Sequence, residues 1–92
     1  MKILAVCGFG VGSSMVLKMT AERVCREIGL DAEVENTDLS SAKGTYADLI
    51  LTSYELAEEI KNSTKTKIYP IKKYMDKEEV RVAIEKYVNE NK

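Results

Sequence analysis

One thiol, three glycines and two hydroxyl groups stand together near the start of the chain, in the segment Cys7–Ser14 (CGFGVGSS). The segment follows the apolar run Ile3–Val6 and leads into a helical pattern that runs to about Ile28. Glycine permits backbone conformations with positive φ, so successive N–H groups can converge on one concave point. The free N–H groups at the start of the following helix also attract anions. The segment therefore predicts a phosphate-binding site with the thiol of Cys7 as a nucleophile at its rim.

The composition excludes several other kinds of site. The 92 residues contain no histidine, which excludes a phosphohistidine on this chain, His-ligated metals and Cys–His or Ser–His nucleophile pairs. The 14 basic and 15 acidic residues nearly balance, so no nucleic acid and no anionic membrane surface is indicated as the main partner. The two cysteines, Cys7 and Cys25, lack C-x-x-C spacing, and a reduced, cytoplasmic setting fits them best. We expect one domain, residues 1–92, that uses no metal and no other cofactor.

Short β-type runs alternate with helical patterns along the chain. Strands are predicted at Ile3–Val6, Asp31–Glu35, Asp48–Thr52 and Lys67–Ile71, and helices at about Ser13–Ile28, at Tyr54–Lys61 and from about Asp76 onward. Such alternation is typical of an α/β fold, a parallel sheet with helices on both faces. The first and third strands are apolar throughout and therefore belong in the centre, which gives the four-stranded order 2-1-3-4.

Three local patterns refine this prediction. The polar stretch Asn36–Tyr46 predicts a connector with one irregular turn. Pro70 cannot donate to a strand ladder, which places the last strand at an edge of the sheet. Asp76 and Glu79 have the spacing of a capping box, so the last helix should begin near them.

The predicted strand order also locates the site. Ligands of parallel α/β sheets bind beyond the carboxyl ends of the strands, where the strand order reverses. That point lies here between the first and third strands. The segment beginning at Cys7 follows the first strand, and Ser53 and Tyr54 follow the third. We therefore expect Ser53 and Tyr54 to form a second wall of the phosphate site.

Known phosphate-binding motifs differ from the segment at single positions. A nucleotide P-loop needs a lysine after its last glycine, but none follows Gly12, and a G-x-G-x-x-G fingerprint would need glycine at Ser13 or Met15. The C-x5-R-[ST] loop of low-molecular-weight tyrosine phosphatases fits better, except that Ser13 replaces the arginine that stabilises a transferring phosphoryl group. No Asp-Pro general-acid loop exists either, since the only proline is Pro70. The site is built to hold a phosphoryl group and poorly equipped to hydrolyse it.

The stretch Ile3–Met15 (ILAVCGFGVGSSM) resembles the phosphocysteine loop of enzyme II B components of the bacterial sugar phosphotransferase system. It is most similar to the ascorbate class, whose loop reads closely as A-V-C-G-x-G-x-G-S-S-M, and then to the galactitol class. The likeness extends more weakly through Ala47–Ile50 and Ser53–Ile60. The resemblance implies a Rossmann-like, phosphatase-like sheet. It also implies that Cys7 accepts a phosphoryl group from a phosphohistidine of the A component and passes it to a sugar held by the membrane C component, the chain's only link to the membrane.

The residues of the predicted site have separate roles. Cys7 is the nucleophile, and a helix N-terminus with convergent amides can lower the pKa of such a thiol by about one unit or more. The backbone N–H groups take up charge on the phosphate oxygens, and the hydroxyls of Ser13 and Ser14 donate to them. The phosphate-binding residues are Gly8, Phe9, Gly10, Val11, Gly12, Ser13 and Ser14.

The first helix carries a second predicted surface. Its core face is formed by Leu17, Ala21, Val24, Cys25 and Ile28, so that Cys25 is expected to be structural. Met15 and Met19 point away from that face, beside the reactive loop. Exposed methionines form adaptable contact surfaces, which predicts a docking site for a partner protein; packing under a neighbouring element is the alternative.

Two other functions stay open on the sequence alone. One is a small cysteine phosphatase or arsenate-reductase-like enzyme, which the serine at position 13 disfavours. The other is an anion-binding module without catalysis.

Overall fold

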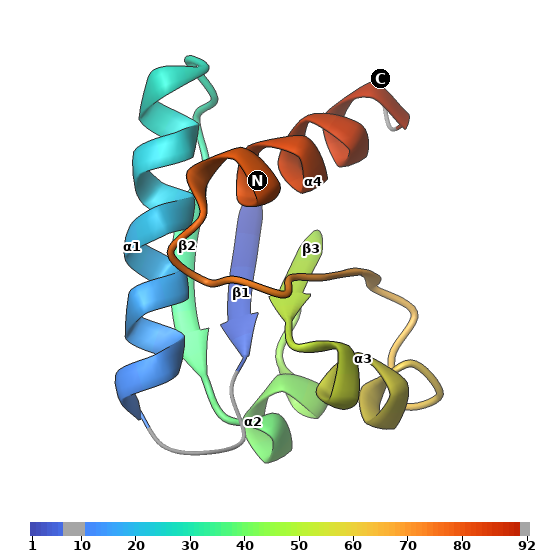
Figure 1. Ribbon diagram of the computed structural model, residues 1–92. Helices are drawn as coiled ribbons and strands as arrows, with labels where there is room; N and C mark the ends of the chain where they lie inside the picture. Colours follow the sequence, from blue (N-terminus) through green and yellow to red (C-terminus); the bar gives the residue numbers. More distant parts are fainter. Residues whose placement is uncertain (7–10, 91–92) are drawn as a thin grey trace.

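A parallel sheet of four strands runs through the part of the protein that the computed structural model describes, residues 1–6 and 11–90. The strands are β1 (Lys2–Val6), β2 (Glu33–Thr37), β3 (Leu49–Thr52) and β4 (Lys67–Pro70). Their order is β2-β1-β3-β4, and each neighbouring pair is parallel. The helices between and after them are α1 (Val11–Glu27), α2 (Leu39–Gly44), α3 (Tyr54–Ile60) and α4 (Lys77–Glu90) (Figure 1). The predicted strand order, with the two apolar strands in the centre, is confirmed.

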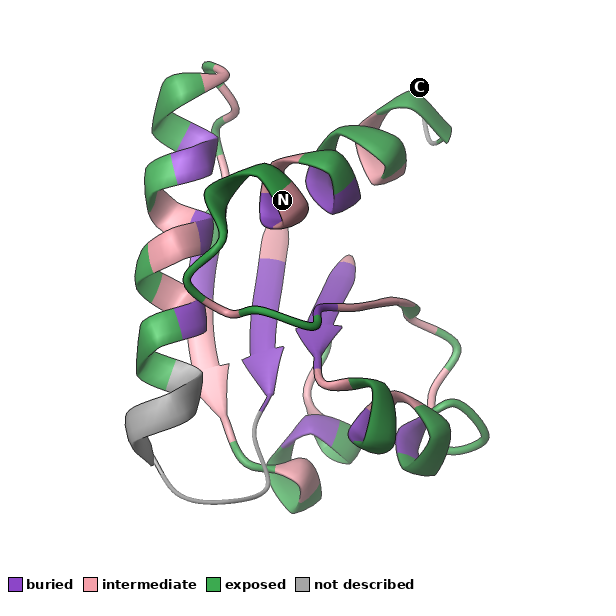
Figure 2. Ribbon diagram, in the orientation of Figure 1, coloured by how far each residue is buried: buried purple, intermediate pink, exposed green. Residues whose placement is uncertain are grey.

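Alternate side chains of the central strands pack against two different helix layers. Ile3, Ala5 and Leu51 lie in one core cluster with buried residues of α1 and α4. Leu4, Val6 and Ile50 lie in a second cluster with buried residues of α2 and α3. Figure 2 shows β1 and β3 buried along almost their whole length. The helices therefore cover both faces of the sheet, as predicted. The expected core face of the first helix is also confirmed, with Leu17, Ala21, Val24 and Cys25 buried and Ile28 packed against them. In α4, Val80, Ala83 and Ile84 are buried.

The ends of α1 differ from those predicted. The helix begins at Val11, two residues before the expected start at Ser13, because Val11 and Gly12 are poor helix formers that gave no helical signal. At the other end, Gly29 adopts a φ of 71° and the N–H of Leu30 donates to the carbonyl of Cys25 over 2.8 Å. Gly29 and Leu30 thus form the end of the helix, and the chain needs a few more residues to reach the sheet. As a result, β2 starts at Glu33 and not at the predicted Asp31.

The predicted irregular turn between β2 and β3 was wrong, because a short helix, α2, lies there. Asp38 caps it, and its Oδ1 accepts the N–H of Ser41 over 2.7 Å. This hydrogen bond lowers the pKa of the Asp38 carboxyl. Ala42 is buried under the sheet and Leu39 packs partly beside it. Two apolar residues in six are too few to reveal a helical period in the sequence.

Candidate functional site

A buried hydroxyl group joins the carboxyl ends of β1 and β3. Thr52 Oγ1 donates to the carbonyl oxygen of Val6 over 2.9 Å, and the Thr52 side chain is fully buried. Val6 is the last residue of β1, and Cys7 follows it in the sequence. Because buried polar groups are almost always held by hydrogen bonds, this contact fixes the point where the chain leaves β1 toward the predicted phosphate segment.

The segment that follows β4 is fixed at the same edge of the sheet. The N–H of Ile71 donates to the carbonyl oxygen of Thr52 over 2.7 Å. The next two N–H groups, of Lys72 and Lys73, donate to the carboxylate of Glu79 in α4 over 2.6 and 2.9 Å. Thr52 and Glu79 therefore set the path of the backbone between β4 and α4.

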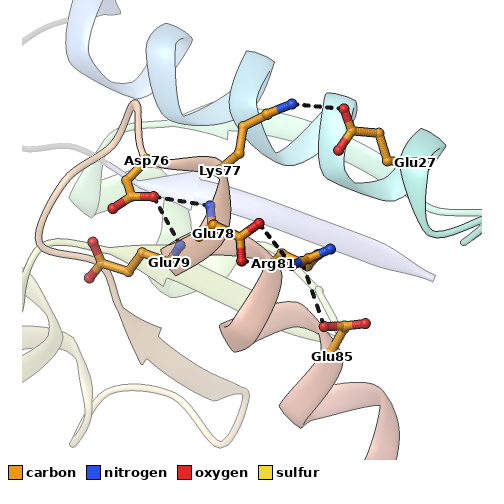
Figure 3. A network of polar contacts seen from close by, with 7 residues as sticks. All are labelled: Glu27, Asp76, Lys77, Glu78, Glu79, Arg81 and Glu85. Carbon is orange, nitrogen blue, oxygen red and sulfur yellow. Dashed lines mark hydrogen bonds and ion pairs between the residues drawn. The ribbon is translucent and has the colours of Figure 1, made fainter.

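Half of the predicted capping box is present. Asp76 Oδ1 accepts the N–H groups of Glu78 and Glu79 over 3.0 and 3.3 Å, so Asp76 caps α4 as expected (Figure 3). The carboxylate of Glu79 does not return to the N–H of Asp76, which donates to the carbonyl of Lys73 over 3.1 Å. Glu79 binds the segment after β4 in its place. The expectation of a complete capping box was therefore wrong.

The two residues of the predicted second wall lie in different surroundings. Ser53 caps α3, and its Oγ accepts the N–H of Leu56 over 3.2 Å. It also lines a shallow hollow of about 400 Å³, together with residues of the segment after β4: Ile71, Lys72, Lys73, Tyr74 and Met75. Tyr54 is exposed and does not line that hollow. The structure thus brings Ser53 beside two lysines that were not among the predicted site residues. In the sequence, the one feature that pointed to Lys72 and Lys73 was that these two cationic residues directly follow a predicted strand.

The predicted nucleophile and part of its cradle lie outside the described residues; these are Cys7, Gly8, Phe9 and Gly10. Val11, Gly12, Ser13 and Ser14 form the first four residues of α1, and their side chains also lie outside the description. The roles given to these eight residues stay predictions.

The second cysteine lies away from this chemistry. Cys25 is a free thiol, 3% exposed, in the core between α1 and the sheet. Burial raises the pKa of its thiol, which disfavours the reactive thiolate. The prediction that Cys25 is a packing residue is confirmed.

The methionines of α1 are exposed, as predicted. Met15 is 40% exposed and Met19 is 60% exposed. Met19 lines a groove between α1 and the segment before α4, whereas Met15 lies outside that groove.

Residues 2–86 match the family model described as the PTS system, Lactose/Cellobiose specific IIB subunit. The chain belongs to the PTS IIB family. A IIB chain is a component of a sugar phosphotransferase system, works with the other components of that system, and is a transferase component. The family resemblance inferred from the Ile3–Met15 stretch is confirmed.

The IIB chain is similar to two proteins named Ascorbate-specific PTS system EIIB component. The one from Mycoplasma pneumoniae is 36% identical over 86 residues, which cover 91% of this chain and 90% of the relative. The one from Escherichia coli O157:H7 is 38% identical over 61 residues, which cover 64% of this chain and 60% of the relative. The fold matches the lactose-specific IIB component domain of Streptococcus pneumoniae with a TM-score of 0.70 at 14% identity, over 100% of this chain and 98% of that one. The predicted Rossmann-like, phosphatase-like fold is confirmed.

Two features are absent from the described residues of the IIB chain. Among these residues, no helix has both the length and the apolar character needed to cross a bilayer. The same residues hold no group of three or more histidine, cysteine or carboxylate side chains placed to bind a metal ion.

Proposed function

We propose that this IIB chain is a phosphoryl carrier. Cys7 accepts a phosphoryl group from a phosphohistidine of the A component and passes it to a sugar bound by the membrane C component. The observation that carries the proposal is the position of the CGFGVGSS segment in the chain. It begins directly after β1 in the chain and includes the first turn of α1, and β1 ends beside the point where the order of the parallel sheet reverses, which is where such sheets bind ligands.

The proposed reaction consists of two in-line displacements. In the first, the Cys7 thiolate attacks phosphorus, an S–P bond forms, and the N–P bond to the donor histidine breaks with its electron pair left on nitrogen. In the second, a sugar hydroxyl oxygen attacks, the S–P bond breaks, and the thiolate leaves. The hydroxyl proton passes to a base of the C component or to water.

The described part of the chain supports this chemistry electrostatically. The 17-residue helix α1 begins within the segment, at Val11, so Val11–Ser14 form the positive end of the helix and carry its free N–H groups. Thr52 holds the end of β1 on the other side of the segment. We include Ser53, Lys72 and Lys73, which share one hollow, in the second wall of the site, and we keep Tyr54 in that wall only as an exposed neighbour.

What the segment lacks supports a carrier more than a phosphatase. Ser13 stands where a phosphatase loop has its arginine, and no Asp-Pro loop supplies a general acid. Phosphocysteine hydrolysis without these groups should be slow. The phosphoryl group would then persist until a partner protein supplies the missing groups.

We further propose ascorbate as the sugar of this system and the cytoplasm, where thiols stay reduced, as its location. The support for ascorbate is the loop pattern and the names of the relatives, one of which shares 36% identity over most of the chain. The sugar contacts would lie on the C component, so uptake of labelled ascorbate by cells with and without this chain tests the assignment. Uptake that does not depend on the chain would contradict it.

Mass spectrometry tests the site itself. After incubation with the phosphodonor chain of the system, the native protein should gain one phosphate, carried on Cys7. Cys25→Ser is the matched control and should gain the same phosphate, whereas Cys7→Ser should gain none. A phosphate that persists in Cys7→Ser would exclude the proposed nucleophile.

A further inference from the structure

Exposed apolar side chains gather at one place on the described surface. Met15, Val16, Met19 and Met75 are four of the eight large hydrophobic side chains that are exposed there. Val16, Met19 and Met75 line a groove of about 500 Å³ between α1 and the segment that leads into α4. Met75 is 81% exposed, and contiguous exposed apolar side chains of this kind mark interaction surfaces. We name this the α1 groove.

Cationic side chains flank the methionines. Arg23 and Arg26 of α1 and Lys77 of α4 line the α1 groove, together with one carboxylate, Glu22. Lys77 is paired with Glu27 over 2.9 Å, and this contact ties the start of α4 to α1 (Figure 3). Among the residues whose side chains are described, Arg23 and Arg26 form no ion pair. Arg23 still acts on Glu27 from a longer distance, since its charge helps to lower the pKa of that carboxyl. The groove therefore offers two arginines that form no direct ion pair among the described residues, next to an apolar floor.

The groove begins close to the predicted phosphate segment. Val16 stands two residues after Ser14, in the first half of α1. A helix rises about 1.5 Å per residue, so the groove extends about 15 Å along α1 from Val16 to Arg26. A protein seated in it would reach the first turn of α1, whose residues Val11–Ser14 belong to the predicted phosphate segment.

We propose that the α1 groove is the docking site of the phosphorylated A component, which would present an apolar centre and an acidic rim; this rests on the proposed function. The arginines favour that donor over the membrane component. Cytoplasmic loops of membrane proteins carry an excess of Lys and Arg, which Arg23 and Arg26 would repel. An acidic rim on the donor would pair with both arginines, while Met19 and Met75 adapt to its apolar centre.

The test measures phosphoryl transfer from the ³²P-labelled A component at increasing donor concentration. Met19→Asp removes an apolar contact from a side chain that is 60% exposed and lines the α1 groove but not the hollow beside Ser53, so the fold should tolerate it. Val82→Asp is its matched control, since Val82 is 60% exposed on α4 and does not line the groove. Met19→Asp should raise the KM for the donor about tenfold and change the limiting rate less than about twofold, and Val82→Asp should change neither.

A second pair of variants tests the charges. Arg23→Gln with Arg26→Gln should raise the KM and flatten its rise with salt, because rim charges act on association. Lys65→Gln with Lys67→Gln removes the same charge from exposed positions just before and at the start of β4 and should match the native protein. Thermal unfolding of each variant confirms that it is folded.

Three results would overturn the docking proposal. The first is an unchanged KM in both groove variants, and the second is an equal rise in the controls. The third is a raised KM for transfer to the C component only, which would make the membrane partner the occupant. In each of these the native protein is still labelled on Cys7, so the carrier proposal stands. A native protein that accepts no phosphate from the donor would remove both proposals.

Discussion

Replacement of Thr52 by valine tests how the fold positions the phosphate segment. Thr52 is fully buried and donates to the carbonyl of Val6 over 2.9 Å. Valine keeps the shape of the side chain and removes only this donor. The net value of a neutral hydrogen bond, together with the cost of a buried acceptor that loses a partner, predicts a loss of about 1–2 kcal/mol in the free energy of unfolding. For a domain of this size that lowers the Tm by roughly 5 to 15 °C.

Thr52→Ser is the matched control. It keeps the hydroxyl group and loses one methyl group, which costs about 1 kcal/mol in a packed core. The two variants should therefore have similar stability, measured by thermal or urea unfolding. They should differ in function, since only valine releases the end of β1. We expect Thr52→Val to slow phosphoryl transfer to Cys7 by about tenfold or more, because small displacements of reacting groups are costly.

Equal transfer rates in the two Thr52 variants would refute this reasoning. The hydroxyl would then contribute to stability alone, and the position of the segment would have to depend on other contacts. A Thr52→Val protein as stable as the native one would refute the calculated magnitude.

Three further predictions concern the elements around the site. Glu79→Ala should speed hydrogen exchange about tenfold at the amides of Lys72 and Lys73, because the loss of its carboxylate removes about 1.4 kcal/mol of protection. Glu78→Ala is the control and should leave the exchange of these amides unchanged. Equal exchange rates in the two variants would contradict the anchoring role of Glu79. The ion pair with α4 lowers the pKa of Glu27 below its ordinary value of 4.5, so its contribution is complete above that pH and lost as the pH falls through the lower pKa of the folded state. The native protein should thus exceed Glu27→Gln in Tm at pH 7, and the difference should shrink below pH 4.5; a constant difference would contradict the pairing. Gly29→Ala should cost about 1 kcal/mol because of its positive φ, whereas Gly44→Ala, with ordinary φ and open space, should not destabilise the protein on urea unfolding.

The order of the strands could be predicted because two of them carry an unmistakable pattern. The strands containing Ile3–Val6 and Leu49–Leu51 are apolar on both faces, and only a central position in a covered parallel sheet buries both. Pro70 marked the edge strand through its missing N–H, and Asp76 marked the start of α4 through its cap. Each of these signals is local and needs no knowledge of a distant partner.

The contacts that fix the site could not be predicted because they join distant parts of the chain. Thr52 and Val6 are 46 positions apart, and nothing in either residue type indicates the pairing. Glu79 had the right spacing for a local cap, yet its carboxylate binds backbone groups six and seven residues earlier. The groove could be predicted only in part. The helical period predicted that Met19 is exposed, whereas Met75 lies in an irregular segment whose path no sequence pattern indicates.

The central claim is that the chain holds a phosphoryl group and releases it only to a partner. The most direct measurement follows ³²P on the isolated phosphoprotein, alone and after addition of membranes that contain the C component with its sugar. We predict that the label stays on Cys7 in the isolated protein and moves to the sugar when the C component is added. Release of inorganic phosphate at the same rate with and without the C component would contradict the claim, because it would identify a phosphatase.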